Sequence, residues 1–246
     1  EGPGEGGFPF ERLSMANDAA KRAAAQAAVA LVDDGMTVGL GTGSTAKFFV
    51  EALAARVQEE RLRLRCVPTS RTARAQAEQF GLTVVPLTNA NRPDLTIDGA
   101  DEVDPALNLI KGGGGALVQE KLVAVSSREM VVIADGSKEV PVLGAFPLPV
   151  AVVPFGWETT CSRLTDAFGV AAALRQSREG HGPFVTDDGL YVVDLHFGEI
   201  PDPAGLEARL RAIVGVAEVG LFVGVAARVV FGAPDGSVRD VFRSAT

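Results

Sequence analysis

The stretch DGADEVDPALNLIKGGGGALVQEK, residues 98–121, organises the rest of the chain. It gathers Asp98, Asp101 and Glu102 with a lysine, four consecutive glycines and a second Glu-Lys pair, which is more charge and backbone freedom than a packing segment needs. The preceding residues 93–97, PDLTI, have the pattern of a short buried strand, so Asp98 follows the end of that strand. In open α/β sheets, ligands bind at the carboxyl ends of the strands. The stretch is therefore the first candidate for a functional site.

Glycines 112–115 and the residues after them predict a turn followed by a helix. Glycine allows positive φ angles and close approach to a bound group, so peptide N–H groups would be available to a ligand. Over residues 116–126, Leu117, Glu120, Lys121 and Ala124 recur with helical spacing, which turns Glu120 toward an apolar interior. Such surroundings raise the pKa of a carboxyl group toward that of a working base. Glu120 is the first candidate for catalysis; the alternative is that these acids lie on the surface of a connecting loop.

The composition is that of a globular protein and limits the classes of partner. The chain has 246 residues, enough for one large or two small domains, with 47% hydrophobic and 22% charged residues. No apolar run approaches the ~18 residues of a membrane span, so no membrane partner is expected. A formal net charge of −8 and a pI near 4.9 argue against nucleic acid as a partner, although lysines gathered locally could still bind a small anion.

The cysteines and histidines do not predict a metal site. Cys66 and Cys161 are far apart, and the two histidines have no zinc-ligand spacing with them. Both cysteines are interpreted as free thiols in a reducing compartment. With so few histidines, proton transfer would fall to carboxylates and lysines.

A second candidate site follows the first predicted strand. Residues 1–13 are rich in Gly and Pro and are expected to be a disordered lead, followed by a helix over 18–32 that is capped by Asn17 or Asp18. A strand at 36–40 leads into the GTGST turn and a helix over 46–58. Unpaired N–H groups and the positive end of the dipole make such a helix start an anion site, and the hydroxyl groups of the turn add donors. The turn lacks the Walker lysine and the third glycine of the dinucleotide fingerprint, so a phosphate is the favoured guest; a tight strand-to-helix connection is the alternative.

The first part of the chain predicts a Rossmann-like α/β domain. Further strands at 62–68, 82–85, 93–97 and 129–134 are apolar runs that alternate with helices, as in a mostly parallel sheet covered on both faces. The strands share a direction, so GTGST, DGADE and ADGSK, which follow three of them, should meet at one edge of the sheet. Two C-terminal strands, 226–231 and 238–242, are expected to rejoin this domain, which would comprise residues 14–144 and 221–246.

A second, smaller domain is predicted over residues 145–220. A proline-rich hinge at 146–149 is followed by strand, helix, two strands, helix and strand. This βαββαβ order is that of a ferredoxin-like α+β domain, with an antiparallel sheet and both helices on one face. We interpret it as a lid on the first domain.

Six segments carry a further signal. They are GLGTGST at 39–45, VPTSRTARAQA at 67–77, the whole stretch 98–121, VIADGSK at 132–138, LGAFPLPVAVVPFG at 143–156 and VGLF at 219–222. In this order they resemble the type A family of ribose-5-phosphate isomerases, over nearly the whole chain after the lead. The combination of DGADE with KGGGGALVQEK is the most specific part of the resemblance.

The resemblance implies an enzyme that interconverts D-ribose 5-phosphate and D-ribulose 5-phosphate in the pentose phosphate pathway, without a metal or organic cofactor. It implies that Glu120 is the general base, with Asp98, Asp101 and Lys111 as further catalytic residues that contact the sugar. The other implied substrate-binding residues are Thr42, Gly43, Ser44, Thr45, Gly99, Ala100, Gly112, Gly113, Gly114, Lys138 and Lys21. A homodimer or homotetramer in the cytoplasm is also implied.

The residues also suggest how such a reaction would run. Glu120 would move a proton from C2 to C1 through a cis-enediolate, whose charge Lys111 and the N–H groups of residues 112–114 would meet. The GTGST turn would hold the phosphate away from the reacting carbons.

Three rival classes differ from this interpretation. A sugar-phosphate sensor domain of a transcriptional regulator would normally come with a basic helix-turn-helix. Acyl-CoA transfer through a glutamyl nucleophile would need a site for a long cofactor. A nicotinamide dehydrogenase is disfavoured, because the third glycine and a ribose-binding acid are missing.

Overall fold

The computed structural model describes residues 9–177, 180 and 182–244. Helix α1 spans Pro9–Val29, so residues 9–13 of the predicted lead belong to a helix, while residues 1–8 lie outside the described residues. The helix start expected at Asn17 or Asp18 is therefore wrong. A capping preference is a weak local signal, and Pro9 is equally compatible with the first turn of a helix.

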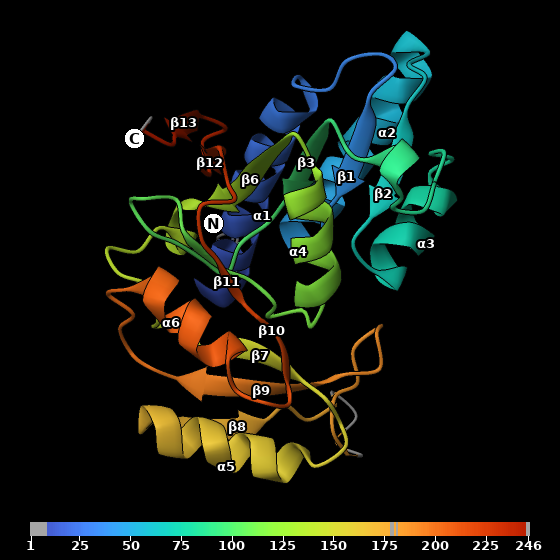
Figure 1. The fold of residues 1–246 in the computed structure, drawn as a ribbon. Helices are drawn as coiled ribbons and strands as arrows, with labels where there is room; N and C mark the ends of the chain where they lie inside the picture. The colour runs from blue at the N-terminus through green and yellow to red at the C-terminus, as the bar shows by residue number, and fades with distance from the viewer. Residues whose placement is uncertain (1–8, 178–179, 181, 245–246) are drawn as a thin grey trace.

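The large domain is built on a six-stranded sheet in the order β13-β12-β6-β3-β1-β2 (Figure 1). Neighbouring strands are parallel, except that β13 pairs antiparallel with β12. The strands are β1 (Thr37–Leu40), β2 (Arg65–Pro68), β3 (Leu95–Asp98), β6 (Glu129–Asp135), β12 (Arg228–Gly232) and β13 (Val238–Phe242). The predicted α/β fold with a mostly parallel sheet is confirmed, including the return of the C-terminal strands.

The strand predicted at 82–85 is reduced to a single bridge, in which Val84 pairs with Cys66. Its hydrogen bonds stop at Val85, because Pro86 follows and has no N–H to continue the pairing. The helices predicted over 46–58 and 116–126 are present, and a further helix lies between them in the sequence. They are α2 (Ser44–Glu60), α3 (Arg71–Gln79) and α4 (Leu117–Ser126), with short 3₁₀ turns at Asn89–Asn91 and Gly136–Lys138.

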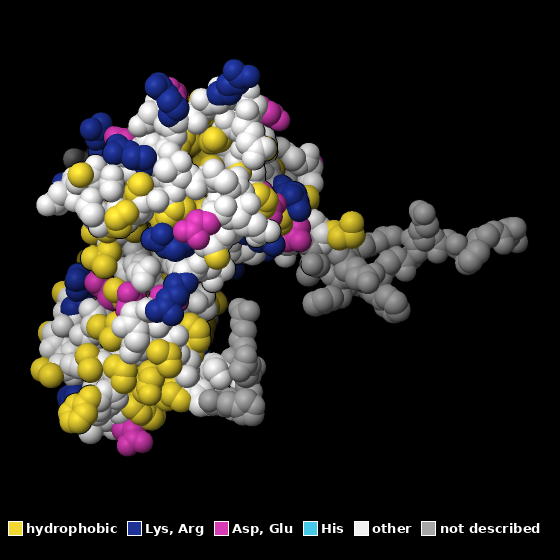
Figure 2. All heavy atoms as spheres, turned by 90° about the vertical axis from the view of Figure 1, so that its right-hand side faces the viewer, with side chains coloured by type: hydrophobic (Ala, Val, Ile, Leu, Met, Phe, Trp, Pro, Cys, Tyr) yellow, Lys and Arg dark blue, Asp and Glu magenta, His cyan; other side chains and the backbone are white. Residues whose placement is uncertain are grey.

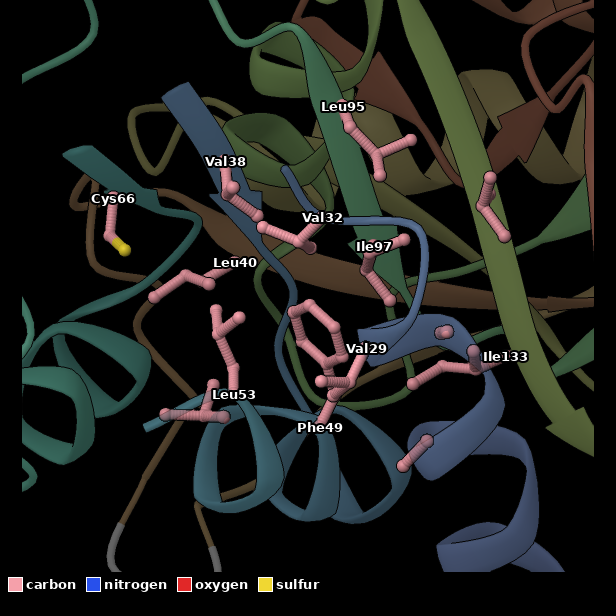
Figure 3. Close-up of a cluster of buried hydrophobic side chains, with 14 of the residues drawn as sticks. Val29, Val32, Val38, Leu40, Phe49, Leu53, Cys66, Leu95, Ile97 and Ile133 are labelled. Atoms are coloured by element: carbon pink, nitrogen blue, oxygen red, sulfur yellow. The ribbon is translucent and has the colours of Figure 1, made fainter. Parts of the chain in front are cut away.

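Two different layers cover the large sheet. On one face, Val29 of α1 and Phe49 and Leu53 of α2 pack against strand residues such as Ile97 (Figure 3). The other face is covered by α4 and by a small antiparallel sheet, which the sequence did not predict. Its strands, in the order β11-β5-β4, are β4 (Glu102–Val103), β5 (Leu109–Ile110) and β11 (Leu221–Phe222).

Alternation along β3 decides which of its side chains face α4. Leu95 and Ile97 join the core beneath α1 and α2, so Thr96 and Asp98 point to the opposite face. There Thr96 Oγ1 lies 2.6 Å from the hydroxyl of Ser127, which follows α4. Space for Asp98 comes from Gly41, where an added Cβ would lie 2.2 Å from Asp98 Oδ1.

The smaller domain contains a four-stranded antiparallel sheet in the order β10-β7-β9-β8. Its elements are β7 (Leu148–Val152), α5 (Trp157–Phe168), β8 (Ala171–Leu174), β9 (Tyr191–His196), α6 (Pro203–Arg211) and β10 (Val216–Val219). This order and these strand directions confirm the predicted ferredoxin-like arrangement. The domain limits at residues 145 and 220 stay a prediction.

The two faces of the smaller sheet have different partners. Leu164 of α5 and Leu210 of α6 belong to the same core as Val150 and Val193, so both helices lie on one face, as predicted. Ala151 and Val192 point the other way and pack with Leu117 of α4. Helix α4 therefore lies between the two sheets (Figure 1).

The surface shows the two domains as two lobes, with apolar side chains gathered on the smaller one (Figure 2). Among its exposed apolar residues are Val153, Phe155 and Val214. Within the described residues, no helix has the length and hydropathy needed to cross a membrane.

Candidate active site

A small cavity lies at the carboxyl edge of β1, β3 and β6, where the three polar motifs were expected to meet. It has a volume of about 200 Å³, which is below the usual range for drug-sized ligands and suits a small polar molecule. Its lining residues are Asn17, Lys21, Thr42, Gly43, Ser44, Thr45, Gly99, Ala100, Asp101, Lys111, Gly112, Gly113, Gly114, Glu120, Asp135, Ser137 and Lys138. The fold thus brings every residue predicted for the site to the cavity wall except Asp98, which is fully buried beside it.

A buried lysine joins the two buried acids. Lys111 Nζ lies 3.0 Å from Asp98 Oδ2 and 3.4 Å from Glu120 Oε1, and it donates a hydrogen bond of 2.7 Å to the carbonyl of Gly99. The unpredicted strand β5 ends directly before Lys111 and fixes its position. Asp98 Oδ1 accepts hydrogen bonds from the N–H groups of Thr42 and Gly99. Asp98 therefore links the GTGST turn to Lys111 rather than facing the cavity itself.

Two carboxylate oxygens in this cluster lack a hydrogen-bond donor. They are Asp98 Oδ2, whose contact with Lys111 is an ion pair without hydrogen-bond geometry, and Glu120 Oε2. Buried polar atoms in proteins almost always have a partner, so such exceptions need an explanation. For Glu120, which lines the cavity, the free oxygen is available to accept a proton or a hydrogen bond from a bound molecule.

Burial and the neighbouring charges together set the pKa values of these groups. Burial raises the pKa of Glu120 to about 8, against the opposing effect of Lys111, and the nearby Asp98 and Asp101 raise it further. Burial also raises the pKa of Asp98. For Lys111, burial alone would lower the pKa, but the Asp98 and Glu120 carboxylates outweigh it and the pKa is raised. The lysine is thus a positive charge beside a carboxyl group whose pKa is raised to about 8.

The position of Glu120 follows from the packing of α4. Leu117, Lys121 and Ala124 of this helix are buried with it, as the helical spacing predicted, and so is Val123. The helix starts after the glycine turn, residues 112–115, in which Gly112 has φ 103° and Gly115 has φ 84°. These are left-handed conformations that favour glycine, so two of the four glycines have the backbone role that was expected.

The other two glycines of the turn meet their surroundings differently. Gly113 donates its N–H to Asp101 Oδ2 at 2.7 Å, and an added Cβ would lie 2.7 Å from Asp101 Oδ1. Its N–H is therefore not free for a ligand, contrary to expectation. At Gly114 an added Cβ would meet no atom within 4 Å, although this glycine lines the cavity.

The GTGST turn has the features of an anion site. Gly43, with φ 114°, is the N-cap of α2 and offers no side chain to cap the first turn, which contains no acidic residue. Ser44 and Thr45 at this helix start border the same cavity as Lys21 and Lys138. Thr42 was expected to donate to a bound anion. Its N–H instead donates to Asp98, and its hydroxyl lies 2.8 Å from the hydroxyls of Thr69 and Ser70.

One acidic residue of the 98–121 stretch lies outside the cavity, and three residues that were not predicted for the site line it. Glu102 of the acidic stretch lies away from the cavity, where its carboxylate accepts hydrogen bonds from the N–H groups of Gly144 and Phe146. Asn17, Asp135 and Ser137 line the cavity but were not predicted as site residues. Asp135 and Ser137 belong to ADGSK, so the motif could have identified them. Asn17 lies one helical turn before Lys21, so the two residues share a helix face. The sequence did not predict this, because the helix was expected to begin only after Asn17 or Asp18.

The comparisons with known proteins agree with this geometry. A family model described as ribose 5-phosphate isomerase A (phosphoriboisomerase A) matches residues 65–236. The chain belongs to the ribose-5-phosphate isomerase A family. It is 51% identical to the ribose-5-phosphate isomerase A of Cereibacter sphaeroides over 95% of both chains, and 51% identical to that of a Synechococcus species over 89% of this chain and 95% of the other.

Solved structures of ribose-5-phosphate isomerases have the same fold. The enzyme of Methanocaldococcus jannaschii matches with a TM-score of 0.86 and 39% identity, covering 90% of this chain and 97% of the other. The enzyme of Plasmodium falciparum matches with a TM-score of 0.88 and 35% identity, covering 93% and 100%. A third, solved in complex with phospho-erythronic acid, has a TM-score of 0.87 and 35% identity over 91% of this chain and 97% of the other. The family expected from the sequence is confirmed: the chain is an isomerase of a family that interconverts ribose 5-phosphate and ribulose 5-phosphate.

Proposed function

We propose that Glu120 is the base that isomerises D-ribose 5-phosphate and D-ribulose 5-phosphate. Its carboxylate takes the proton from C2 of the aldose, which leaves a cis-enediolate, and returns it to C1 to give the ketose, while the hydroxyl proton of O2 is transferred to O1. The same step run backwards gives the aldose, so a single carboxyl group serves both directions. The observation that supports this role is the buried Oε2 of Glu120, which has no donor and lines the cavity.

Lys111 and the glycine turn would stabilise the enediolate. Lys111 stays positively charged between Asp98 and Glu120, at 3.0 Å and 3.4 Å, so its charge is available when negative charge develops on the sugar oxygens. Preorganised donors of this kind contribute about 3 kcal/mol each to lowering a barrier. Phospho-erythronic acid, present in one solved relative, combines a phosphate with a carboxylate, and an enediolate of a sugar phosphate would carry charge at similar positions.

The two aspartates would have different tasks. Asp101 lines the cavity, so we assign to it the proton transfers on sugar hydroxyls that open the furanose ring. Asp98 is fully buried and would act by holding Lys111 and the backbone of Thr42. The phosphate would bind at the start of α2, between Lys21 and Lys138, where its binding energy can orient the reacting carbons.

The setting of the reaction follows from the family. We infer that the chain serves the pentose phosphate pathway in the cytoplasm and assembles as a homodimer or homotetramer. The exposed Phe155 and Val214 of the smaller domain, 94% and 80% accessible, are compatible with further association. Light scattering of the purified chain would measure the assembly directly, and a monomer at micromolar concentration would contradict it.

Replacement of Glu120 tests the central assignment. Glu120→Gln keeps the shape but removes the base, so turnover should fall by about 10²–10⁴-fold, while phospho-erythronic acid still binds. In the parent enzyme, deuterium placed at C2 of ribose 5-phosphate should appear at C1 of the ketose or in water, and the variant should lose this transfer. Glu129 is exposed, so Glu129→Gln is a matched control, and its turnover should equal that of the parent. Persisting turnover in the Glu120 variant would overturn the assignment.

A further inference from the structure

An arginine of the smaller domain contacts the glycine turn. Arg175 follows β8, and its Nη1 donates hydrogen bonds to the carbonyls of Gly112, at 2.8 Å, and Gly113, at 3.1 Å. These two carbonyls belong to the peptide units whose N–H groups are those of Gly113 and Gly114. Both glycines line the cavity.

The guanidinium is itself held in place. Its Nε and Nη2 donate to the two carboxylate oxygens of Asp194 on β9, and the two side chains are only 16% and 19% exposed. The backbone of Arg175 is paired on both sides, since its N–H donates to Val192 and its carbonyl accepts from Phe184. A bidentate pair of this kind fixes the plane of the guanidinium, so the direction of Nη1 toward the turn is set by the smaller domain.

A positive charge on a peptide carbonyl changes the N–H of the same peptide unit. Hydrogen bonds in a chain polarise one another, so a donor at the carbonyl makes the N–H on the opposite side a stronger donor. Along this turn, the effect runs from Arg175 through the Gly112 carbonyl to the N–H of Gly113, which holds Asp101 at 2.7 Å. It also runs through the Gly113 carbonyl to the N–H of Gly114.

We propose that Arg175, fixed by Asp194, is a positioning residue for the isomerisation. It orients and polarises the glycine turn, so that the N–H of Gly114 and the carboxylate of Asp101 face the sugar during formation of the enediolate. This inference rests on the proposed function of Glu120 and Lys111 at the same site. The smaller domain would then take part in catalysis through Arg175, in addition to its predicted role as a lid.

Substitution of Arg175 tests the proposal. In Arg175→Met the turn loses its charged donor, and kcat should fall by about tenfold or more, since outright removal of an oxyanion donor costs about 10²–10³. The phosphate site lies at the start of α2, so binding of inorganic phosphate should stay unchanged. Binding of phospho-erythronic acid should weaken in parallel with kcat. Asp194→Asn, which keeps the arginine but loosens it, should give an intermediate loss and serves as the second variant if Arg175→Met does not fold.

The chain offers a matched control in another bidentate pair. Arg228 donates through Nε and Nη2 to Asp240, at 2.9 Å and 2.6 Å, between β12 and β13, and its side chain is 18% exposed. Arg228→Met therefore removes a similar ion pair without touching the glycine turn, and its kcat should match the parent. The proposal is overturned if Arg175→Met retains the parent kcat, or if both arginine variants lose activity equally.

Failure of this inference can be told apart from failure of the proposed base. If Glu120→Gln abolishes proton transfer from C2 while Arg175→Met leaves kcat unchanged, only the role of Arg175 is wrong. If Glu120→Gln retains turnover, the base assignment is wrong whatever the arginine variants do.

Discussion

At the scale of single residues, the ionisation of Glu120 gives a direct prediction. A base must be deprotonated in the free enzyme, and burial raises the pKa of Glu120 to about 8. The value of kcat/KM should therefore decrease as the pH falls through about 8. Asp101 contributes to the raised pKa of Glu120, so Asp101→Asn should shift this decrease to lower pH, even if the substitution also lowers the maximal rate. A pH–rate profile of both proteins would check this, and a profile that is flat across pH 8 would contradict it.

Gly114 gives a second prediction at this scale. Its φ is not positive and an added Cβ meets no protein atom within 4 Å, so Gly114→Ala should fold with an unchanged melting temperature. The methyl group would instead extend into space at the cavity wall, where overpacking against a ligand costs about 1–3 kcal/mol, and KM should rise by about tenfold or more.

The neighbouring glycine supplies the contrast for this prediction. Gly113→Ala would place its Cβ 2.7 Å from Asp101 Oδ1, so this variant should lose stability as well as activity. Equal KM values for Gly114→Ala and the parent would show that substrate does not approach this glycine.

At the scale of elements, the close approach of the turn after β1 to the end of β3 depends on one glycine, Gly41. A Cβ on Gly41 would lie 2.2 Å from Asp98 Oδ1 and 2.5 Å from Asp98 Cα, and the backbone atom cannot move aside cheaply. Gly41→Ala should destabilise the fold by about 1–3 kcal/mol and lower activity by displacing Asp98 from Lys111. Urea denaturation measures the loss. Gly136→Ala, with no atom within 4 Å and no positive φ, is the control, and equal stability of the two variants would refute the steric explanation.

The sequence predicted those elements whose pattern is local. The apolar run before Asp98 predicted that this residue follows the end of a strand, and the helical spacing of residues 116–126 predicted that Glu120 faces an apolar interior. The small sheet could not be predicted, because strands of two residues have no detectable period, yet β5 is what positions Lys111. Arg175 lies in a stretch without any motif, and the residue that it contacts, Gly112, is far away in the chain. Local sequence spacing therefore could not predict this contact.

At the scale of the whole molecule, the smaller domain contacts residues 112–121 at both ends. Arg175 holds the glycine turn before α4. Lys121, the residue after Glu120, donates to Glu207 of α6 and Glu218 of β10, at 2.7 Å and 2.8 Å, and to the carbonyl of Val219. That this domain is a lid stays a prediction, and its contacts on both sides of Glu120 suggest a second one, that they hold this residue in position.

Lys121 tests the second prediction. Its side chain is 8% exposed, and its ammonium group lies 5.0 Å from the ring centre of Phe222, so it is desolvated together with two carboxylates that are also mostly buried. Lys121→Met would leave those carboxylates without their main partner, and breaking a buried pair in this way costs about 3–5 kcal/mol. The free energy of unfolding should fall accordingly, whereas the exposed Lys47→Met should change it little.

The same variant should also lose activity at temperatures where it is still folded. Because α4 would then be fixed to the smaller domain mainly through Leu117 and its apolar neighbours, Glu120 would sample positions away from the C2 proton, and kcat would fall more than KM would rise. Assays well below the melting temperature separate this effect from unfolding. Loss of stability with an unchanged kcat would mean that the large domain alone holds Glu120 in position.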